Sequence, residues 1–110
     1  MTRELLPERR RSETFDLPFG GLTDPHTVTV GYYDDGRPGE VFITGGKSGE
    51  QIEAIARDCA ILLSMCLQHG VSLDTVRHAL TRDSRDAAMS IVGAVVDQLS
   101  EPWPKLVASQ

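Results

Sequence analysis

The chain has 110 residues, of which 40% are hydrophobic and 25% charged, and its net charge at pH 7 is −5. These values predict one globular domain with a modest core, and the acidic balance argues against nucleic-acid binding, which uses a basic surface. No apolar run approaches the ~20 residues of a membrane span, and no apolar core of a signal peptide follows the charged N-terminal residues. We therefore expect a cytoplasmic protein that binds neither nucleic acid nor membrane.

The N-terminal segment, residues 1–11, is charged and lacks any hydrophobic period. Its basic cluster, Arg9 to Arg11, is flanked by the acidic residues Glu8 and Glu13, as in a solvated arm. We divide the chain into this N-terminal arm, a single α+β domain over residues 12–101 and a C-terminal tail over residues 102–110.

Three strands are predicted in the N-terminal half of the domain. Residues 13–17 give a short strand, and a loop rich in glycine and proline follows it. Residues 26–33 alternate with period 2, which places Tyr32 on the inward face and Tyr33 on the outward face. After the turn-forming sequence DDGRPG, residues 40–44 continue as a third strand, so the last two strands form an antiparallel hairpin.

The first helix is predicted to begin at Ser48, whose hydroxyl caps the first turn while Gln51 reaches back to it as a capping box. Gly70 ends the helix as a left-handed cap. Cys59 and Cys66 lie two turns apart, ~10.5 Å, too far for a disulfide, and we interpret both as small buried hydrophobes. The apolar positions recur at spacings of three and four, as on a helix with one buried face: Ile52, Ile55, Ala56, Cys59, Leu62, Leu63, Cys66 and Leu67.

Two further helices are predicted in the C-terminal half. Ser72 caps a short one, and Asp83 or Ser84 begins a third, which ends before Pro102. Their inward positions are Leu73, Val76 and Leu80 on the second helix, and Ala88, Ile91, Val92, Val95 and Leu99 on the third. Strands followed by helices define the α+β class: a small antiparallel sheet of two to three N-terminal strands packed against three C-terminal helices. So small a sheet cannot stand alone, so the first helix is expected to cover its apolar face.

The glycine turn before the first helix is the one candidate ligand site. Gly45, Gly46, Lys47 and Ser48 resemble a phosphate-binding loop, but the full pattern needs a glycine where Val41 stands. Free backbone amides at a helix N-terminus beside a lysine still form a generic anion site. The alternative is that the glycines serve only the tight turn and that the lysine is solvated.

Metal and catalytic constellations are sparse. Cys66 and His69 share a helix face, and His78 lies on the next helix, but the sequence has no CxxC or HxxxH pair, so we expect no metal site. His26 with Asp24, or His78 with Asp74, could form acid–base pairs, but neither pair has a nucleophile tied to it. We expect no catalytic residue in this chain.

Taken together, these segments resemble the TSCPD family, the small domain at the C-terminal end of adenosylcobalamin-dependent (class II) ribonucleotide reductases, which also occurs as a stand-alone protein. The resemblance covers about residues 6–99. It is carried by LPERRR, the glycines at 20 and 21, YYDDGRPGEVFI, the GKSG helix entry, LLSMCLQHGVSLDTV and SIVGAVVDQL.

The resemblance implies an association with the radical synthesis of deoxyribonucleotides, with adenosylcobalamin as the radical source of the full-length enzyme. No position here corresponds to the radical cysteine or the redox cysteine pair of the catalytic barrel, so we expect this chain to bind no cofactor of its own. The Thr-Ser-Cys-Pro-Asp motif that names the family is also missing, because the tail reads EPWPKLVASQ.

Two functions remain as hypotheses. The first is a non-catalytic accessory or regulatory module that contacts the catalytic chain of a ribonucleotide reductase. The second is a small sensor that binds a nucleotide or phosphate at the turn over residues 45–48. The surplus of apolar residues on the third helix, including Val95 and Val96, further predicts a homodimer or an obligate complex through that helix, with or without the first helix, unless residues 1–20 cover it.

Overall fold

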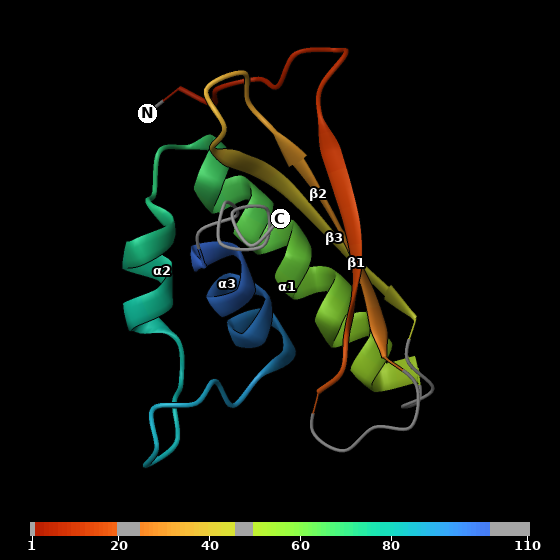
Figure 1. Cartoon of the computed structure of the whole chain (residues 1–110), viewed down its shortest axis with the longest axis vertical. Coiled ribbons are helices and arrows are strands. Elements are labelled where there is room, and N and C mark those ends of the chain that lie inside the picture. Colours follow the sequence, from red (N-terminus) through yellow and green to blue (C-terminus); the bar gives the residue numbers. More distant parts are fainter. Residues whose placement is uncertain (1, 20–24, 46–49, 102–110) are drawn as a thin grey trace, which may run out of the picture.

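A computed structural model of the chain describes residues 2–19, 25–45 and 50–101. It has three strands followed by three helices, which confirms the α+β class (Figure 1). The predicted strand ends at Leu17 and His26 are confirmed, and the other four are shifted by one or two residues. The elements are β1 (Ser12–Leu17), β2 (His26–Tyr32), β3 (Pro38–Gly45), α1 (Glu50–Gln68), α2 (Leu73–Ala79) and α3 (Ile91–Ser100).

The three strands form an antiparallel sheet in the order β1-β2-β3, so β3 is an edge strand. Val28 pairs with Phe15 on one side and with Ile43 on the other, and these paired side chains share the inner face. The neighbouring row, Thr14 with Thr29 and then Phe42, faces outward. The period-2 pattern therefore predicted the faces of the hairpin correctly.

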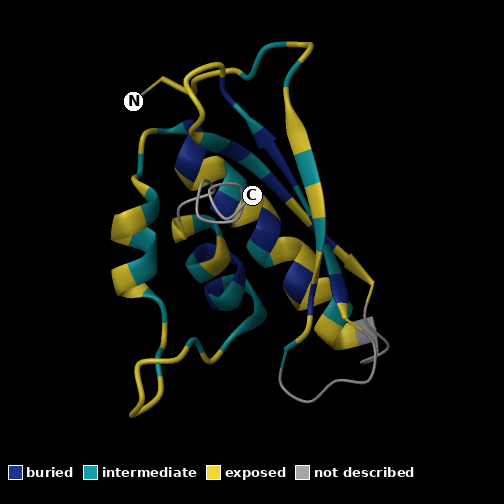
Figure 2. Cartoon of the chain, in the orientation of Figure 1, coloured by how far each residue is buried: buried dark blue, intermediate teal, exposed yellow. Residues whose placement is uncertain are grey.

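All three helices lie on the inner side of the sheet, with α2 farthest from it (Figure 1). α1 packs chiefly against β3, as expected, and α3 contributes Val95 and Val96, both fully buried. Figure 2 shows the buried residues gathered between the sheet and these two helices. The core consists of Leu17, Val28, Val30, Val41, Ile43, Ala56, Ala60, Leu63, Leu67, Val95 and Val96.

The caps of the short helix agree with prediction. Ser72 is the N-cap of α2, and its hydroxyl accepts a hydrogen bond from the backbone N–H of Thr75. Gly70 has a φ of 90°, the left-handed conformation expected after α1. The predicted cap of α1 at Ser48 lies outside the described residues.

The predicted start of the third helix is wrong. α3 begins at Ile91 with Ser90 as its N-cap, so Ala88 precedes the helix instead of lying on its stripe. The reason is local: the Asp83 carboxylate accepts hydrogen bonds from the backbone N–H groups of Arg85 and Ala87, and Asp86 adopts a φ of 64°. This side-chain-bonded turn satisfies the amides that would otherwise open a helix there.

The predicted burial of α1 is wrong at several positions. Ile55 and Leu62 are more than half exposed, and Ile52 is 40% exposed. Cys66 is exposed and Cys59 is intermediate, so the two free thiols are not both buried hydrophobes. The helix is apolar on more than one side, and its core face is a narrower stripe at residues 56, 60, 63 and 67.

The N-terminal arm is bonded across the end of the sheet and the last turn of α1. The backbone N–H of Glu4 donates to the carbonyl of Gln68 at 2.7 Å, and the Tyr33 hydroxyl donates to the Glu4 carbonyl at 2.6 Å. Tyr33 is therefore buried, contrary to the predicted outward position, because it lies past the end of β2 and beneath the arm.

Candidate functional site

The glycine turn is only partly described. Gly45 is the last residue of β3 and has a φ of 81°, a left-handed conformation that favours glycine. Gly46, Lys47 and Ser48, the remaining members of the predicted anion site, lie outside the described residues. The geometry of that site therefore stays a prediction.

Next to Gly45, the structure places a residue that the anion-site prediction did not include. His26 pairs with Gly45 across the sheet and with Leu17 on its other side, so its ring lies on the inner face. The ring is fully buried, and neither Nδ1 nor Nε2 has a hydrogen-bond partner among the described residues. A buried polar group without a partner is costly, typically by 1–3 kcal/mol, so this imidazole calls for an explanation.

Sequence reasoning singled out His26 only as a partner of Asp24, and Asp24 lies outside the described residues. The information that the sequence did not provide is the pairing register of the strands. A histidine at the start of an otherwise apolar inner row can be recognised only once the strand pairing with Gly45 is known.

A second feature is the way α1 protects the free edge of β3. The Ser64 hydroxyl accepts a hydrogen bond from the Val41 backbone N–H at 2.8 Å and lies 3.2 Å from the Val41 carbonyl. The buried Gln68 amide donates to the Gly39 carbonyl at 2.9 Å. Two side chains of one helix thus satisfy backbone groups that an edge strand normally leaves open.

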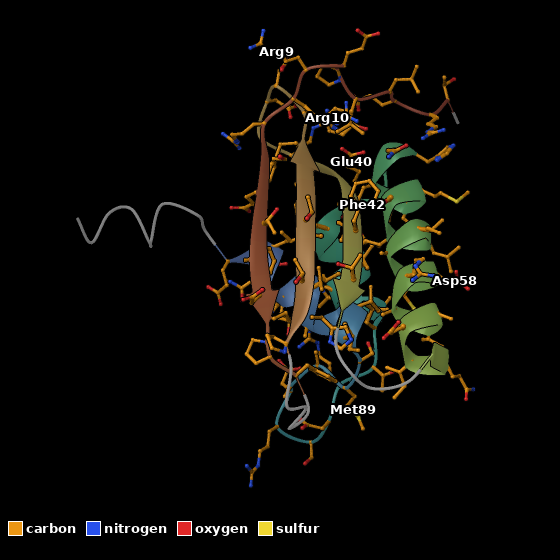
Figure 3. All side chains as sticks on the ribbon, turned by 90° about the vertical axis from the view of Figure 1, so that its right-hand side faces the viewer. Arg9, Arg10, Glu40, Phe42, Asp58 and Met89 are labelled. Carbon is orange, nitrogen blue, oxygen red and sulfur yellow. The ribbon has the colours of Figure 1, made fainter. Side chains whose placement is uncertain are left out.

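An open groove of about 400 Å³ runs along this edge, between β3 and α1. Its walls include the exposed side chains of Phe42, Ile61 and Met65, and Arg57 lies along it. Figure 3 shows Phe42 on β3 beside α1 and Asp58 on the side of α1 that points away from the sheet. Apolar walls with few charges suit an apolar side chain or a protein surface better than a phosphate.

Two charged residues of the arm are paired with residues of the hairpin. Arg10 bonds to Glu40 on β3, and Arg37, in the turn before β3, bonds to Glu4 and to Asp35. Hydrogen bonds from Arg37 lower the pKa of the Asp35 carboxyl. These pairs hold the arm against the hairpin.

A further ion cluster joins α3 to the segment after α2. Arg82 bonds through its guanidinium to Asp97, and Arg77 lies 3.4 Å from the same carboxylate. The hydrogen bond from Arg82 lowers the pKa of the Asp97 carboxyl. Since every member has an opposite partner, the cluster fits a structural role.

The other candidates weighed on the sequence are not brought together. In the described part of the chain, no group of three histidine, cysteine, aspartate or glutamate side chains is arranged to hold a metal ion. His78 lies 3.5 Å from Asp74, but both are exposed on the short helix α2. Within residues 2–19, 25–45 and 50–101, no helix is both long and apolar enough to cross a bilayer.

Fold and edge geometry define a small α+β module in which helix α1 covers the inner face and the free edge of a three-stranded sheet. The family model of the TSCPD domain matches residues 1–101, nearly the whole chain. The chain belongs to the TSCPD domain family, as the sequence patterns predicted.

Three curated relatives are similar to this chain, and each is a vitamin B12-dependent ribonucleotide reductase. The protein of Rhodopirellula baltica is 40% identical over 67% of this chain. The Bradyrhizobium diazoefficiens protein is 41% identical over 72%, and that of Agrobacterium fabrum is 37% identical over 83%. The chain spans only 6–7% of the length of these relatives. No solved structure gives a significant match.

Proposed function

We propose that this chain is a non-catalytic accessory or regulatory module of deoxyribonucleotide synthesis, which acts by contact with a vitamin B12-dependent ribonucleotide reductase. One observation carries the proposal. The TSCPD match covers nearly all of this chain, while the chain spans only 6–7% of the length of the reductases that share its sequence. Most of a reductase therefore has no counterpart here.

The arrangement of side chains supports a role by contact. The buried His26 ring is closed off from solvent, and the Asp97 carboxylate is bonded to Arg82. The apolar recess between β3 and α1 is an open groove on the surface, the form that a protein partner can fill.

Nothing in the groove beside β3 favours binding of the relatives' cofactor. A corrin ring with its adenosyl group is much bulkier than the drug-sized ligands that pockets of 300–1,000 Å³ hold, and the groove beside β3 measures about 400 Å³ and is open. We therefore assign no step involving adenosylcobalamin to this chain.

Co-purification from a lysate that contains a B12-dependent reductase tests the proposal. Tagged wild-type chain should recover the reductase. Overexpression of the chain, or deletion of its gene, should change the cellular deoxynucleotide pools. A tagged, unrelated acidic protein of similar size serves as the control. Recovery of no reductase, together with unchanged pools on deletion, would contradict the proposal.

A second function, a nucleotide or phosphate sensor at residues 45–48, is favoured by the unpartnered buried ring of His26 opposite Gly45. A ligand that reached this end of the sheet would give the ring a partner. Calorimetry with nucleoside diphosphates, nucleoside triphosphates and inorganic phosphate tests it, with Lys47→Ala as the matched variant. Heat that disappears in Lys47→Ala supports the sensor, and no heat at millimolar ligand removes it.

A further inference from the structure

The outward side of α1 has a composition that a solvent-facing helix rarely has. Residues 59–67 read CAILLSMCL, nine positions without a charge that cover every side of the helix. The one polar member is Ser64, and its hydroxyl bonds inward to β3. A helix that is apolar all round is normally buried all round, but the described residues cover only one side of α1.

Two separate stripes run along this helix. The first, residues 56, 60, 63 and 67, packs into the core. The second stripe consists of Ile52, Ile55, Cys59, Leu62 and Cys66, whose spacings alternate between three and four residues. This is the heptad pattern through which two helices pair in a coiled coil, and we call this stripe the heptad seam. None of these residues is buried in the chain. The seam therefore predicts a helix as the missing partner.

The exposed apolar area is of the size that a dimer needs. Each exposed large side chain on this side of α1 contributes roughly 100 Å², which gives about 400 Å², close to the apolar part of a standard interface of ~800 Å² per partner. The side chains counted are Ile52, Ile55, Leu62 and Met65, all between 40% and 61% exposed.

The matching helix is found in this chain itself. α2 is only seven residues long, and the apolar residues of α3 are used in the core, where Val95 and Val96 are fully buried. Among the described helices, α1 alone has an uncovered heptad seam. We propose that α1 pairs with α1 of a second copy, so that the chain is a homodimer through Ile55, Leu62 and Cys66 with their exposed neighbours.

The proposed dimer surface is therefore α1 and not α3, the helix that the sequence pattern favoured. Glutamate at position 96 would disrupt the core instead of releasing a folded monomer, because Val96 is fully buried. Addition of a partner strand at β3 is also disfavoured, since Ser64 and Gln68 already bond to the strand edge.

Sedimentation equilibrium of the full chain tests the proposal, in reducing buffer because a disulfide through the exposed Cys66 would mimic association. We expect the wild type to be a dimer at micromolar concentration. Leu62→Glu should weaken dimerisation about 30-fold or more, since it buries a charge at the centre of the seam. Ile55→Glu should do the same, and circular dichroism should show both variants folded.

Met89→Glu is the matched control. Met89 is 58% exposed in the segment before α3 and lies apart from α1 (Figure 3), so this variant should remain dimeric. The expected dissociation constant of the dimer is micromolar, so about 100 µM protein should be almost entirely dimeric. A wild type that stays monomeric at that concentration overturns the proposal, whether or not the chain binds a reductase. A dimer that survives both Leu62→Glu and Ile55→Glu overturns it as well.

Discussion

The Ser64 hydroxyl on α1 accepts the Val41 backbone N–H of β3 at 2.8 Å, joining the middle of a helix to the free edge of the sheet. The same oxygen lies 2.9 Å from the Ala60 carbonyl, one turn back in its own helix, to which it can donate its single hydrogen. One side chain thus fixes the position of α1 along β3, which sets the walls of the groove and the direction of the outward face of the helix.

Ser64→Ala should lower the free energy of unfolding by about 1–3 kcal/mol, because it leaves the Val41 N–H without its partner in a half-buried place. Urea denaturation at neutral pH measures the change. Ser100→Ala is the matched control: Ser100 bonds only to the carbonyl one turn back, at Val96, so its loss should cost less. Equal effects of the two substitutions would contradict a special role of the strand contact.

Much of this arrangement follows from local sequence, and some does not. The hairpin of β2 and β3 was predictable because Val28 and Ile43 lie on regular period-2 runs. The exposed side of α1 was not, because helical spacing shows that a residue is apolar but cannot tell which of two stripes the sheet covers. The start of α3 was missed because the Asp83 turn competes with helix formation in a way that spacing does not register.

The candidate site was predictable only in part. Gly45 was expected in a turn and has the positive φ that favours glycine. The buried ring of His26 depends on strand register, and the burial of Tyr33 depends on a contact with Glu4, 29 residues away. Such long-range pairings leave no periodic trace in the sequence.

His26→Leu should raise the free energy of unfolding by about 1 kcal/mol, because an apolar side chain replaces a buried polar ring that has no partner in the described structure. Thermal and urea unfolding without ligand measure this. His78→Leu is the control, since His78 is exposed, and it should change stability little. A clear loss of stability in His26→Leu would show that the ring has a partner in solution.

Gly39→Ala should destabilise the protein by roughly 1–3 kcal/mol, the usual range for overpacking. A Cβ at this position would lie 2.5 Å from the Tyr33 ring and 2.9 Å from the Leu6 side chain. The substitution should also loosen the arm, which hydrogen exchange of its amides detects. Gly36→Asn is the control, because no atom lies within 4 Å of its Cβ position and asparagine tolerates the positive φ. An arm equally protected in both variants would contradict this account.

The Arg82–Asp97 pair should make stability depend on acid pH. Hydrogen bonding to Arg82 holds the folded pKa of Asp97 below the unfolded value near 3.9. Its contribution is therefore full above the unfolded pKa and is lost as the pH falls through the folded pKa. Between pH 6 and pH 3 the wild type should lose more stability than Asp97→Asn. If the urea midpoints of the two proteins fall by the same amount across that pH range, the pair is excluded as a source of acid sensitivity.

Direct binding to a purified B12-dependent ribonucleotide reductase tests the central claim. Sedimentation velocity should follow the fluorescently labelled chain with and without unlabelled reductase, and an excess of unlabelled chain should compete. The account predicts that the labelled chain moves at the rate of the larger enzyme at micromolar concentration and returns to its own rate on competition. An unchanged sedimentation rate at all reductase concentrations, with a folded chain and an active enzyme, would contradict it.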